Sequence, residues 1–273
     1  MIRLTIGRDT TVCMSLSARP GTFGSRFHNH LYDALGLDYV YKAFSTNDLT
    51  AAIAGIRALG IRGCAISMPF KEAVIPLLDG LAPSARAIDS VNTIVNDQGQ
   101  LIGHNTDYAA IASLICKYDL RPDTQFALRG SGGMAKAVVA ALRDGGLEKG
   151  WIVARNQQTG RALAHAYGYQ YSQELGELRP AMLINVTPIG MTGGAEADAL
   201  AFSPGAVAEA ETVFDVVAIP VETPLVRHAR GAGKTVITGG EVIVRQALDQ
   251  FVLYTGITPS AAQAQEAATF ALG

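Results

Sequence analysis

The sequence has little of what marks secreted or membrane-spanning proteins. Its three cysteines, Cys13, Cys64 and Cys116, lie far apart and follow neither a disulfide framework nor a metal-site spacing. No apolar run approaches the roughly 18 residues that a membrane-spanning helix requires, and the N-terminal stretch has no signal-peptide pattern. We therefore expect a cytoplasmic protein whose cysteines are reduced.

Charge is also scarce and nearly balanced. Charged residues make up 17% of the chain, the formal net charge is −2, and no run of lysine and arginine occurs. This composition argues against nucleic acid and membrane surfaces as partners, so we expect small-molecule partners and a monomer or a homodimer. Of the five histidines only His28 and His30 lie close together, with no cysteine or carboxylate at ligand spacing, and no metal site is predicted.

Apolar residues, in contrast, are abundant. They make up 49% of 273 residues, which is enough to form the cores of two domains. Strand-like and helix-like segments alternate, which is typical of an α/β protein with parallel sheets. Strands are predicted over residues 11–16, 39–44, 61–67, 126–129, 150–155, 181–186, 213–217 and 234–238. Helices are predicted over residues 27–35, 46–59 and 108–118, on to Leu78 after the third strand, and in the tail from Glu241.

Two local signals refine this pattern. Ser45 or Thr46 is predicted to cap the helix over residues 46–59, because short hydroxyl side chains accept hydrogen bonds from the first helical amides. The turn-forming residues 97–99 predict a hairpin. The first half ends near the sequence GHNTD, and the helical tail is expected to fold back across the boundary between the halves.

The stretch LRGSGGMAKAVVAAL, residues 128–142, follows a predicted strand and opens a predicted helix. Gly130, Gly132 and Ala135 satisfy the G-x-G-x-x-G/A pattern of dinucleotide-binding proteins. The missing side chains let a pyrophosphate reach the amides of the helix N-terminus. The alternative is a tight strand-to-helix turn that binds nothing.

The next predicted strand ends at Arg155 and Asn156, where NAD-binding proteins carry an acidic residue that bonds the ribose. A guanidinium would instead attract the 2′-phosphate of NADP, which a carboxylate would repel. The pattern therefore favours NADP over NAD. A solvated arginine at a strand end is the open alternative.

Polar residues also end other predicted strands. Asn185 and Thr187 of INVTPIGM could hold either backbone or cofactor, and Asp107 of HNTD could lie in an exposed turn. Lys71 follows Ser67 and a proline after a buried strand, at the edge where parallel sheets bind ligands. A lone lysine is usually solvent-facing, so these residues alone select no substrate.

The ordered set MSLS, SMPFK, VNT, NTD, GSGGMAKA, NVTPIGM, DVVAIPVETP and GGEVIVRQ, spread over nearly the whole chain, resembles the shikimate dehydrogenase family. The resemblance implies a reversible NADP-dependent oxidation of shikimate to 3-dehydroshikimate. It also implies a substrate domain of residues 1–107 plus 239–273, with the C-terminal helices returning to it, and a Rossmann-type NADP-binding domain of residues 108–238. The reaction would take place in the cleft between them.

The resemblance also implies roles for individual residues. Lys71 and Asp107 match the catalytic pair of the family. Ser15 and Ser17 match the serines that hold the substrate carboxylate. The residues matching the hydroxyl-binding set are Ser67, Asn92 and Gln246. The expected cofactor-binding residues are Gly130, Ser131, Gly132, Gly133, Met134, Ala135, Arg155, Asn185, Thr187 and Gly239.

Several positions depart from the family pattern. Met14 and Ala18 replace a histidine and a proline, Ser67 replaces a threonine, and Ala65 and Ala218 replace a common asparagine and a frequent tyrosine. These changes remove polar partners from the pocket rim, indicate a shikimate dehydrogenase-like branch and allow a low turnover of shikimate. Quinate or amino-shikimate dehydrogenase activity, relaxed cofactor choice and a non-catalytic NADP-binding sensor are the alternatives.

Overall fold

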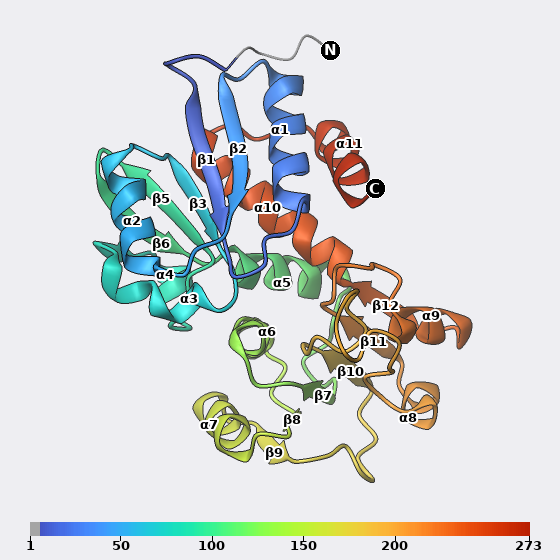
Figure 1. Ribbon diagram of the computed structural model, residues 1–273. Coiled ribbons are helices and arrows are strands. Elements are labelled where there is room, and N and C mark those ends of the chain that lie inside the picture. The colour runs from blue at the N-terminus through green and yellow to red at the C-terminus, as the bar shows by residue number, and fades with distance from the viewer. Residues whose placement is uncertain (1–5) are drawn as a thin grey trace. The chain divides into compact units, whose positions relative to one another are not determined.

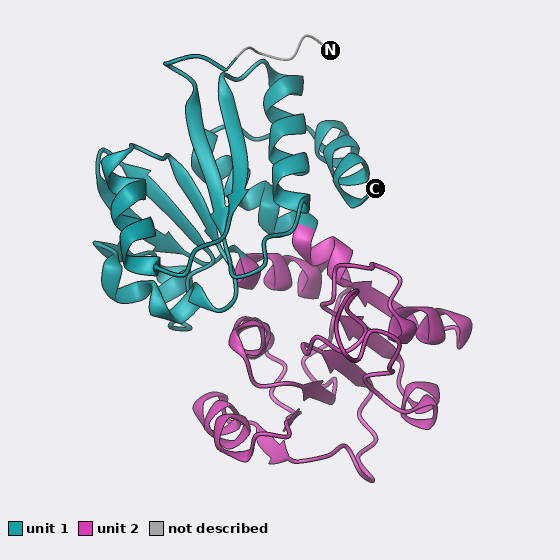
Figure 2. Ribbon diagram, in the orientation of Figure 1, with its two compact units in different colours: residues 1–106, 244–273 teal, residues 107–243 magenta. Residues whose placement is uncertain are grey.

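The computed structural model describes residues 6–273 and divides into two compact units. Of the described residues, unit 1 comprises 6–106 and Val244–Gly273, and unit 2 comprises Asp107–Ile243 (Figure 2). Both units are α/β, as the sequence predicts, and the C-terminal helices return to the first unit. These limits differ from the expected domain boundaries at Asp107 and at residues 239–243, which lie in unit 2.

Unit 1 is built on a six-stranded mixed sheet with the order β2-β1-β3-β5-β6-β4 (Figure 1). The strands are β1 (Thr11–Leu16), β2 (Tyr39–Phe44), β3 (Gly63–Ile66), β4 (Gly80–Leu81), β5 (Thr93–Asp97) and β6 (Gln100–His104). β1 pairs in parallel with β2 and β3, whereas β5 runs antiparallel to β3 and β6. The hairpin predicted at residues 97–99 is confirmed, and its turn places Gln98 and Gly99 at positive φ.

Helices cover both faces of this sheet. On one face, Ile53 and Ile56 of α2 (Leu49–Ala58) are buried in a core with β1 and β3. On the other, His28 of α1 (Phe23–Leu35) stacks on Tyr41 at 4.5 Å and lies 6.2 Å from Phe251 of α10 (Gly239–Thr255), measured between ring centroids. The shorter helices are α3 (Phe70–Ala73), the 3-10 helix η1 (Ile75–Leu77) and α4 (Pro83–Arg86). The last helix, α11 (Ala261–Leu272), packs on α1.

Four predicted elements of unit 1 have wrong boundaries. The helix expected over residues 27–35 already begins at Phe23. The helix expected over residues 46–59 begins at Leu49, because Asp48 caps it by accepting a hydrogen bond from the amide of Ala51 at 2.9 Å. Thr46 instead accepts a bond from the Asp48 amide. The strand expected over residues 61–67 is shorter, and the helix expected on to Leu78 is interrupted into α3 and η1.

Unit 2 is a six-stranded, fully parallel sheet with the order β12-β11-β10-β7-β8-β9. The strands are β7 (Phe126–Arg129), β8 (Gly150–Val153), β9 (Gln170–Ser172), β10 (Met182–Asn185), β11 (Thr212–Asp215) and β12 (Thr235–Thr238). The helices are α5 (Thr106–Lys117), which starts with the last residue of unit 1, α6 (Gly133–Asp144), α7 (Gln157–Tyr167), α8 (Pro204–Glu209) and α9 (Pro224–Gly231). The sequence predicted every strand except the short β9.

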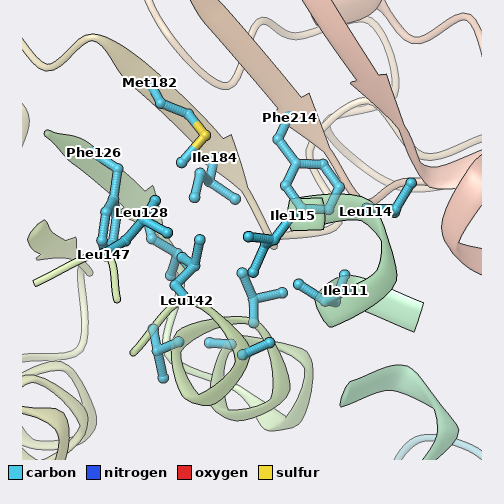
Figure 3. Close-up of a cluster of buried hydrophobic side chains, with 14 of the residues drawn as sticks. Ile111, Leu114, Ile115, Phe126, Leu128, Leu142, Leu147, Met182, Ile184 and Phe214 are labelled. Atoms are coloured by element: carbon cyan, nitrogen blue, oxygen red, sulfur yellow. The ribbon is translucent and has the colours of Figure 1, made fainter. Parts of the chain in front are cut away.

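The sheet of unit 2 is buried on both faces. Figure 3 shows Ile111 and Ile115 of α5 and Leu142 of α6 directed at Leu128 and Phe214 of the strands. A separate core, formed largely by β7, β10, β11, α8 and α9, fills the opposite face. Such two-sided burial explains why these strands are apolar runs rather than alternating patterns. Within residues 6–273, no helix combines the length and the apolar character needed to cross a membrane.

The return of α10 to unit 1 can be tested at Gly63. A Cβ at this position would overlap the ring of Tyr254, which is 1% exposed. Gly63→Ala should therefore lower the free energy of unfolding by about 1–3 kcal/mol, the usual cost of overpacking. Urea denaturation measures the change.

Gly55→Ala in α2 is the matched control. No atom lies within 4 Å of its added Cβ, and alanine favours a helix over glycine by roughly 0.5–1 kcal/mol. This variant should therefore be more stable than the wild type. Equal stability of the Gly63 variant and the wild type would contradict the packing of Tyr254 on β3.

Candidate functional site

The three candidate serines share one edge of the sheet in unit 1. β1 and β3 run parallel with Leu16 opposite Ile66, so Ser15, Ser17 and Ser67 come at the carboxyl ends of neighbouring strands. The amide of Ser67 donates to the carbonyl of Leu16 at 3.0 Å. Ser17 is buried and Ser67 is exposed. This edge is where parallel strands present ligand-binding groups.

The side chain of Ser15 on β1 lies near the phenol of Tyr41 on β2. Burial raises the pKa of the Tyr41 phenol, and the Ser15 hydroxyl opposes this shift. Ser17 points the same way as Ser15 along the strand, since side chains two residues apart share a face. The two hydroxyls therefore lie on one side of the sheet edge.

Lys71 lies in the short helix α3, which follows the carboxyl end of β3. β3 ends at Ile66, the amide of Phe70 donates to the carbonyl of Ser67 at 2.9 Å, and Lys71 is the second residue of α3. The carbonyl of Lys71 accepts from the amide of Val91 at 2.9 Å. Its backbone is thus tied to the residue that precedes Asn92.

Asn92 is the centre of a buried hydrogen-bond network in unit 1. Its Nδ2 donates to Thr106 Oγ1 at 3.0 Å and to Gln246 Oε1 at 3.4 Å. Its Oδ1 accepts from the Thr106 amide at 2.8 Å and from Thr93 Oγ1 at 2.8 Å. The Asn92 side chain, 2% exposed, therefore joins segments that are far apart in the chain.

Sequence reasoning missed Thr106 and Gln250 in this network. Gln250 Nε2 donates to Thr93 Oγ1 at 3.0 Å and to the Asn92 carbonyl at 3.5 Å. Gln250 follows Gln246 by one helical turn on α10, so helical spacing could have pointed to it. Thr106 carried no motif of its own apart from its place in NTD.

Asp107 is the second residue of α5 and is 1% exposed. A carboxylate in the first turn of a helix is stabilised by the helix dipole. Thr106, which Asn92 holds, directly precedes it. The backbone of Lys71 is thus bonded to Val91, the residue before Asn92, and Asp107 directly follows Thr106, which Asn92 holds.

The glycine-rich loop of unit 2 has the geometry that the fingerprint requires. Gly130 has φ +125°, and a Cβ there would lie 2.8 Å from Val186 Cγ2. Gly132 caps α6 in an extended conformation, and no atom lies within 4 Å of its missing Cβ. Ala135 is fully buried against the sheet. The space at Gly132 fits a pyrophosphate at the start of α6.

Residues beside this loop hold the next helix in place. Ser131 Oγ lies 2.7 Å from Thr159 Oγ1, and Asn156 caps α7 by accepting from the Thr159 amide at 3.1 Å. Met134 packs on the core beneath α6. Arg155, in contrast, has a side chain that is 83% exposed, with its nearest carboxylate, Glu196, at 3.9 Å. Its guanidinium is available to an anion.

Two predicted cofactor residues are bonded to the protein itself. Asn185 is fully buried, donates to Asp215 Oδ1 at 3.0 Å and to the Ile189 carbonyl at 3.2 Å, and accepts from Thr187 Oγ1 at 2.6 Å. The sequence left open whether Asn185 and Thr187 hold the backbone or a cofactor. These contacts favour a role in holding the backbone. A Cβ at Gly239 would overlap the backbone of Val217, so close packing alone requires glycine there.

Asp215, at the end of β11, was not singled out from the sequence. Its carboxylate also accepts from the Val217 amide at 3.1 Å and from Thr223 Oγ1 at 2.7 Å, and it is fully buried. Burial raises its pKa, although these hydrogen bonds act in the opposite direction. Asp215 therefore ties together the loops that follow β10 and β11.

A parallel sheet whose first strand leads through an open glycine-rich turn into a helix defines unit 2 as a Rossmann-type dinucleotide-binding fold. Residues 22–94 of unit 1 match the family model described as shikimate dehydrogenase substrate binding domain. Among the described residues, no three histidine, cysteine or acidic side chains are grouped to hold a metal ion.

Three known proteins are similar over most of their length. A shikimate dehydrogenase-like protein of Haemophilus influenzae is 56% identical over 97% of this chain and 98% of its own. A shikimate dehydrogenase (NADP(+)) of Chlorobaculum tepidum is 36% identical over 84% of both chains. The structure of a Thermus thermophilus shikimate 5-dehydrogenase in complex with NADP(H) and shikimate matches with a TM-score of 0.85 at 29% identity, covering 96% of this chain and 100% of that one. The chain belongs to the shikimate dehydrogenase family.

The raised pKa of Asp215 has a consequence for stability. The folded state holds this proton more tightly than the unfolded state, so the contribution of Asp215 to stability falls as pH rises from the ordinary aspartate range through the raised pKa. Asp215→Asn removes the titration. The stability of the wild type relative to this variant, measured by urea denaturation, should therefore decrease as pH rises above the ordinary aspartate range. A difference that rises with pH would contradict the burial of this carboxylate.

Proposed function

We propose that this protein catalyses the reversible, NADP-dependent oxidation of shikimate to 3-dehydroshikimate. The observation that carries the proposal is the buried hydrogen-bond network of Asn92, Thr106 and Gln246. Its amide and hydroxyl side chains are of the type that can bind the hydroxyl groups of a ring. It lies in unit 1, in which residues 22–94 match the substrate-binding family model. The names of relatives, shikimate dehydrogenase (NADP(+)), support the same activity.

In this proposal unit 1 binds the substrate and unit 2 binds NADP. Ser15 and Ser17 would hold the substrate carboxylate, and Ser67, Asn92 and Gln246 its hydroxyls. The glycine-rich turn at Gly130–Ala135 would hold the pyrophosphate, for which the open space at Gly132 is suited. When bound, NADP supplies the acceptor for hydride.

The chain itself supplies the proton acceptor. Oxidation of a ring alcohol releases a proton from the hydroxyl as hydride leaves the same carbon. Lys71 would accept this proton at Nζ, and Asp107 would orient the lysine and the hydroxyl. A pure binding protein would not need this pair, which argues against a non-catalytic sensor.

A different ring substituent is the second candidate for the substrate. Ala65 of β3 lies opposite Ser15 in one direction and Thr93 in the other. A methyl group there leaves more space beside the candidate serines than the asparagine expected from the family pattern, and it offers no hydrogen bond. This favours quinate or an amino-substituted shikimate as competing substrates, and a lower rate with shikimate.

Steady-state rates of NADP and NAD reduction with shikimate, quinate and amino-substituted shikimate test the proposal. Measurable turnover with at least one of these acids, faster with NADP, is expected. No turnover of any of them, with NADP still bound, would support the sensor and contradict the proposed reaction. A higher kcat/KM for quinate than for shikimate would select the second candidate.

Lys71→Ala should lower kcat by about a hundred- to ten-thousand-fold, the range that positioned proton transfer supplies. Asp107→Asn should also lose rate, and the double variant should be little slower than the worse single variant, because the two residues act as a unit. Lys149→Ala, at an exposed position, is the control and should keep the wild-type rate. If the Lys71→Ala variant kept more than about a tenth of the wild-type kcat, Lys71 would not be the residue that accepts the proton.

Arg155→Ala should weaken NADP binding by roughly 1–3 kcal/mol, because a charge-assisted contact to the 2′-phosphate is lost. NAD, which lacks this phosphate, should bind the variant as it binds the wild type. Arg227→Ala on α9 is the control, since its side chain is exposed and donates to a backbone carbonyl. Equal losses for the two cofactors, measured by calorimetry, would be the contrary result.

A further inference from the structure

β7 ends in a charged residue, Arg129, although the strand lies inside a buried sheet. Phe126, Ala127 and Leu128 are fully buried, and the next residue is Arg129, immediately before Gly130 of the glycine-rich turn. Arg129 pairs with a residue of β8 on one side and a residue of β10 on the other, so it stands at the carboxyl edge, inside the sheet. A guanidinium there needs a partner to offset the loss of water.

The side chain of Arg129 lies on the face of the sheet opposite to α6. Ala127, two residues earlier on the same face, belongs to the core with α8, whereas Phe126 and Leu128 belong to the core beneath α6. The Arg129 guanidinium carbon stacks 5.1 Å from the ring centroid of Phe202, which holds it in place. It therefore does not point at the start of α6, where the pyrophosphate would lie.

Protein contacts leave part of this guanidinium unsatisfied. Within residues 6–273, the buried Nε of Arg129 has no hydrogen-bond partner. Burial lowers the pKa of Arg129, and repulsion from Arg155 lowers it further, while Glu174 and Glu196 attract it. Two guanidiniums that repel each other beside an unsatisfied donor favour an anion between them.

A cavity of about 450 Å³ in unit 2 offers the space. Arg129, Arg155 and Arg179 line it, together with Glu174 and Glu209. Arg179 is neutralised, because it pairs with Glu209 and with Glu177 at 3.2 Å. Arg155 approaches a carboxylate, that of Glu196, only at 3.9 Å and its side chain is 83% exposed. Arg129 and Arg155 are therefore better placed than Arg179 to bind an anion in this cavity.

We propose that Arg129 is a second, partly buried arginine for the 2′-phosphate of NADP, which it would bind together with Arg155. The inference rests on the proposed function, in which Arg155 follows β8 at the ribose end of the cofactor. A phosphomonoester carries close to two negative charges, which match two guanidiniums, and a planar guanidinium can donate two parallel hydrogen bonds to it. Arg129 would thus contribute to the choice of NADP over NAD.

Calorimetric titrations of NADPH, NADH and adenosine 2′,5′-bisphosphate into the wild type, Arg129→Met and Arg179→Met test the inference. Arg129→Met should weaken NADPH and the bisphosphate by about 10- to 100-fold, the loss expected for a hydrogen bond to a charged group, and NADH less than about twofold. Arg179→Met, in the same cavity but with its charge already paired, should change all three affinities less than about twofold.

Arg129→Lys is a second variant that keeps the charge without the paired donors. It should lose about 3- to 10-fold in NADPH affinity and should fold even if Arg129→Met does not. A wild type without preference for NADPH over NADH would overturn the proposed cofactor and this inference together. A wild-type preference that survives in the Arg129 variants would overturn the role of Arg129 alone.

Discussion

The buried amide of Asn92 is the constraint on which the candidate substrate site depends. One side chain hydrogen-bonds the first residue of α5, the neighbouring Thr93 and Gln246 of α10, which is 154 residues away. Each buried polar group of this amide that lost its partner would lower the stability of the folded state by about 1–3 kcal/mol. The network therefore helps to hold these segments together in the folded protein. Gln250 of α10 extends the network, because its Nε2 donates to Thr93 Oγ1.

Unit 2 uses the same principle at the edge of its parallel sheet. Asp215 and Asn185 hold the loops that follow β11 and β10, so these loops are shaped by contacts within the protein. The glycine-rich turn has the opposite character, since Gly132 leaves open space where a side chain would be. Rigid, satisfied loops beside an open turn provide a preorganised place for a ligand.

Local patterns made most of the fold predictable. The parallel strands are apolar runs that can be recognised in the sequence. The spacing of Gly130, Gly132 and Ala135 lies within six consecutive residues, so it can be recognised there too. The N-terminus of α2 was misplaced because several residues in a row, Thr46 to Asp48, could cap it, and only the folded chain selects one. Asp215 and Arg129 carried no local signal of their role, since their partners lie on other elements, and Gln250 was marked only by its helical spacing from Gln246. Ordered motifs of a family indicated the candidate site residues, but the contacts that hold these residues depend on tertiary structure.

Hydride transfer from the ring carbon is the central claim, and isotope transfer tests it most directly. Shikimate carrying deuterium at carbon 3 would be incubated with the protein and NADP through a single turnover, and the nucleotide analysed by mass spectrometry. The account predicts NADPH that contains one deuterium, with 3-dehydroshikimate formed in equal amount. Reduced nucleotide without deuterium, or a bound nucleotide that stays oxidised with every ring acid offered, would contradict it.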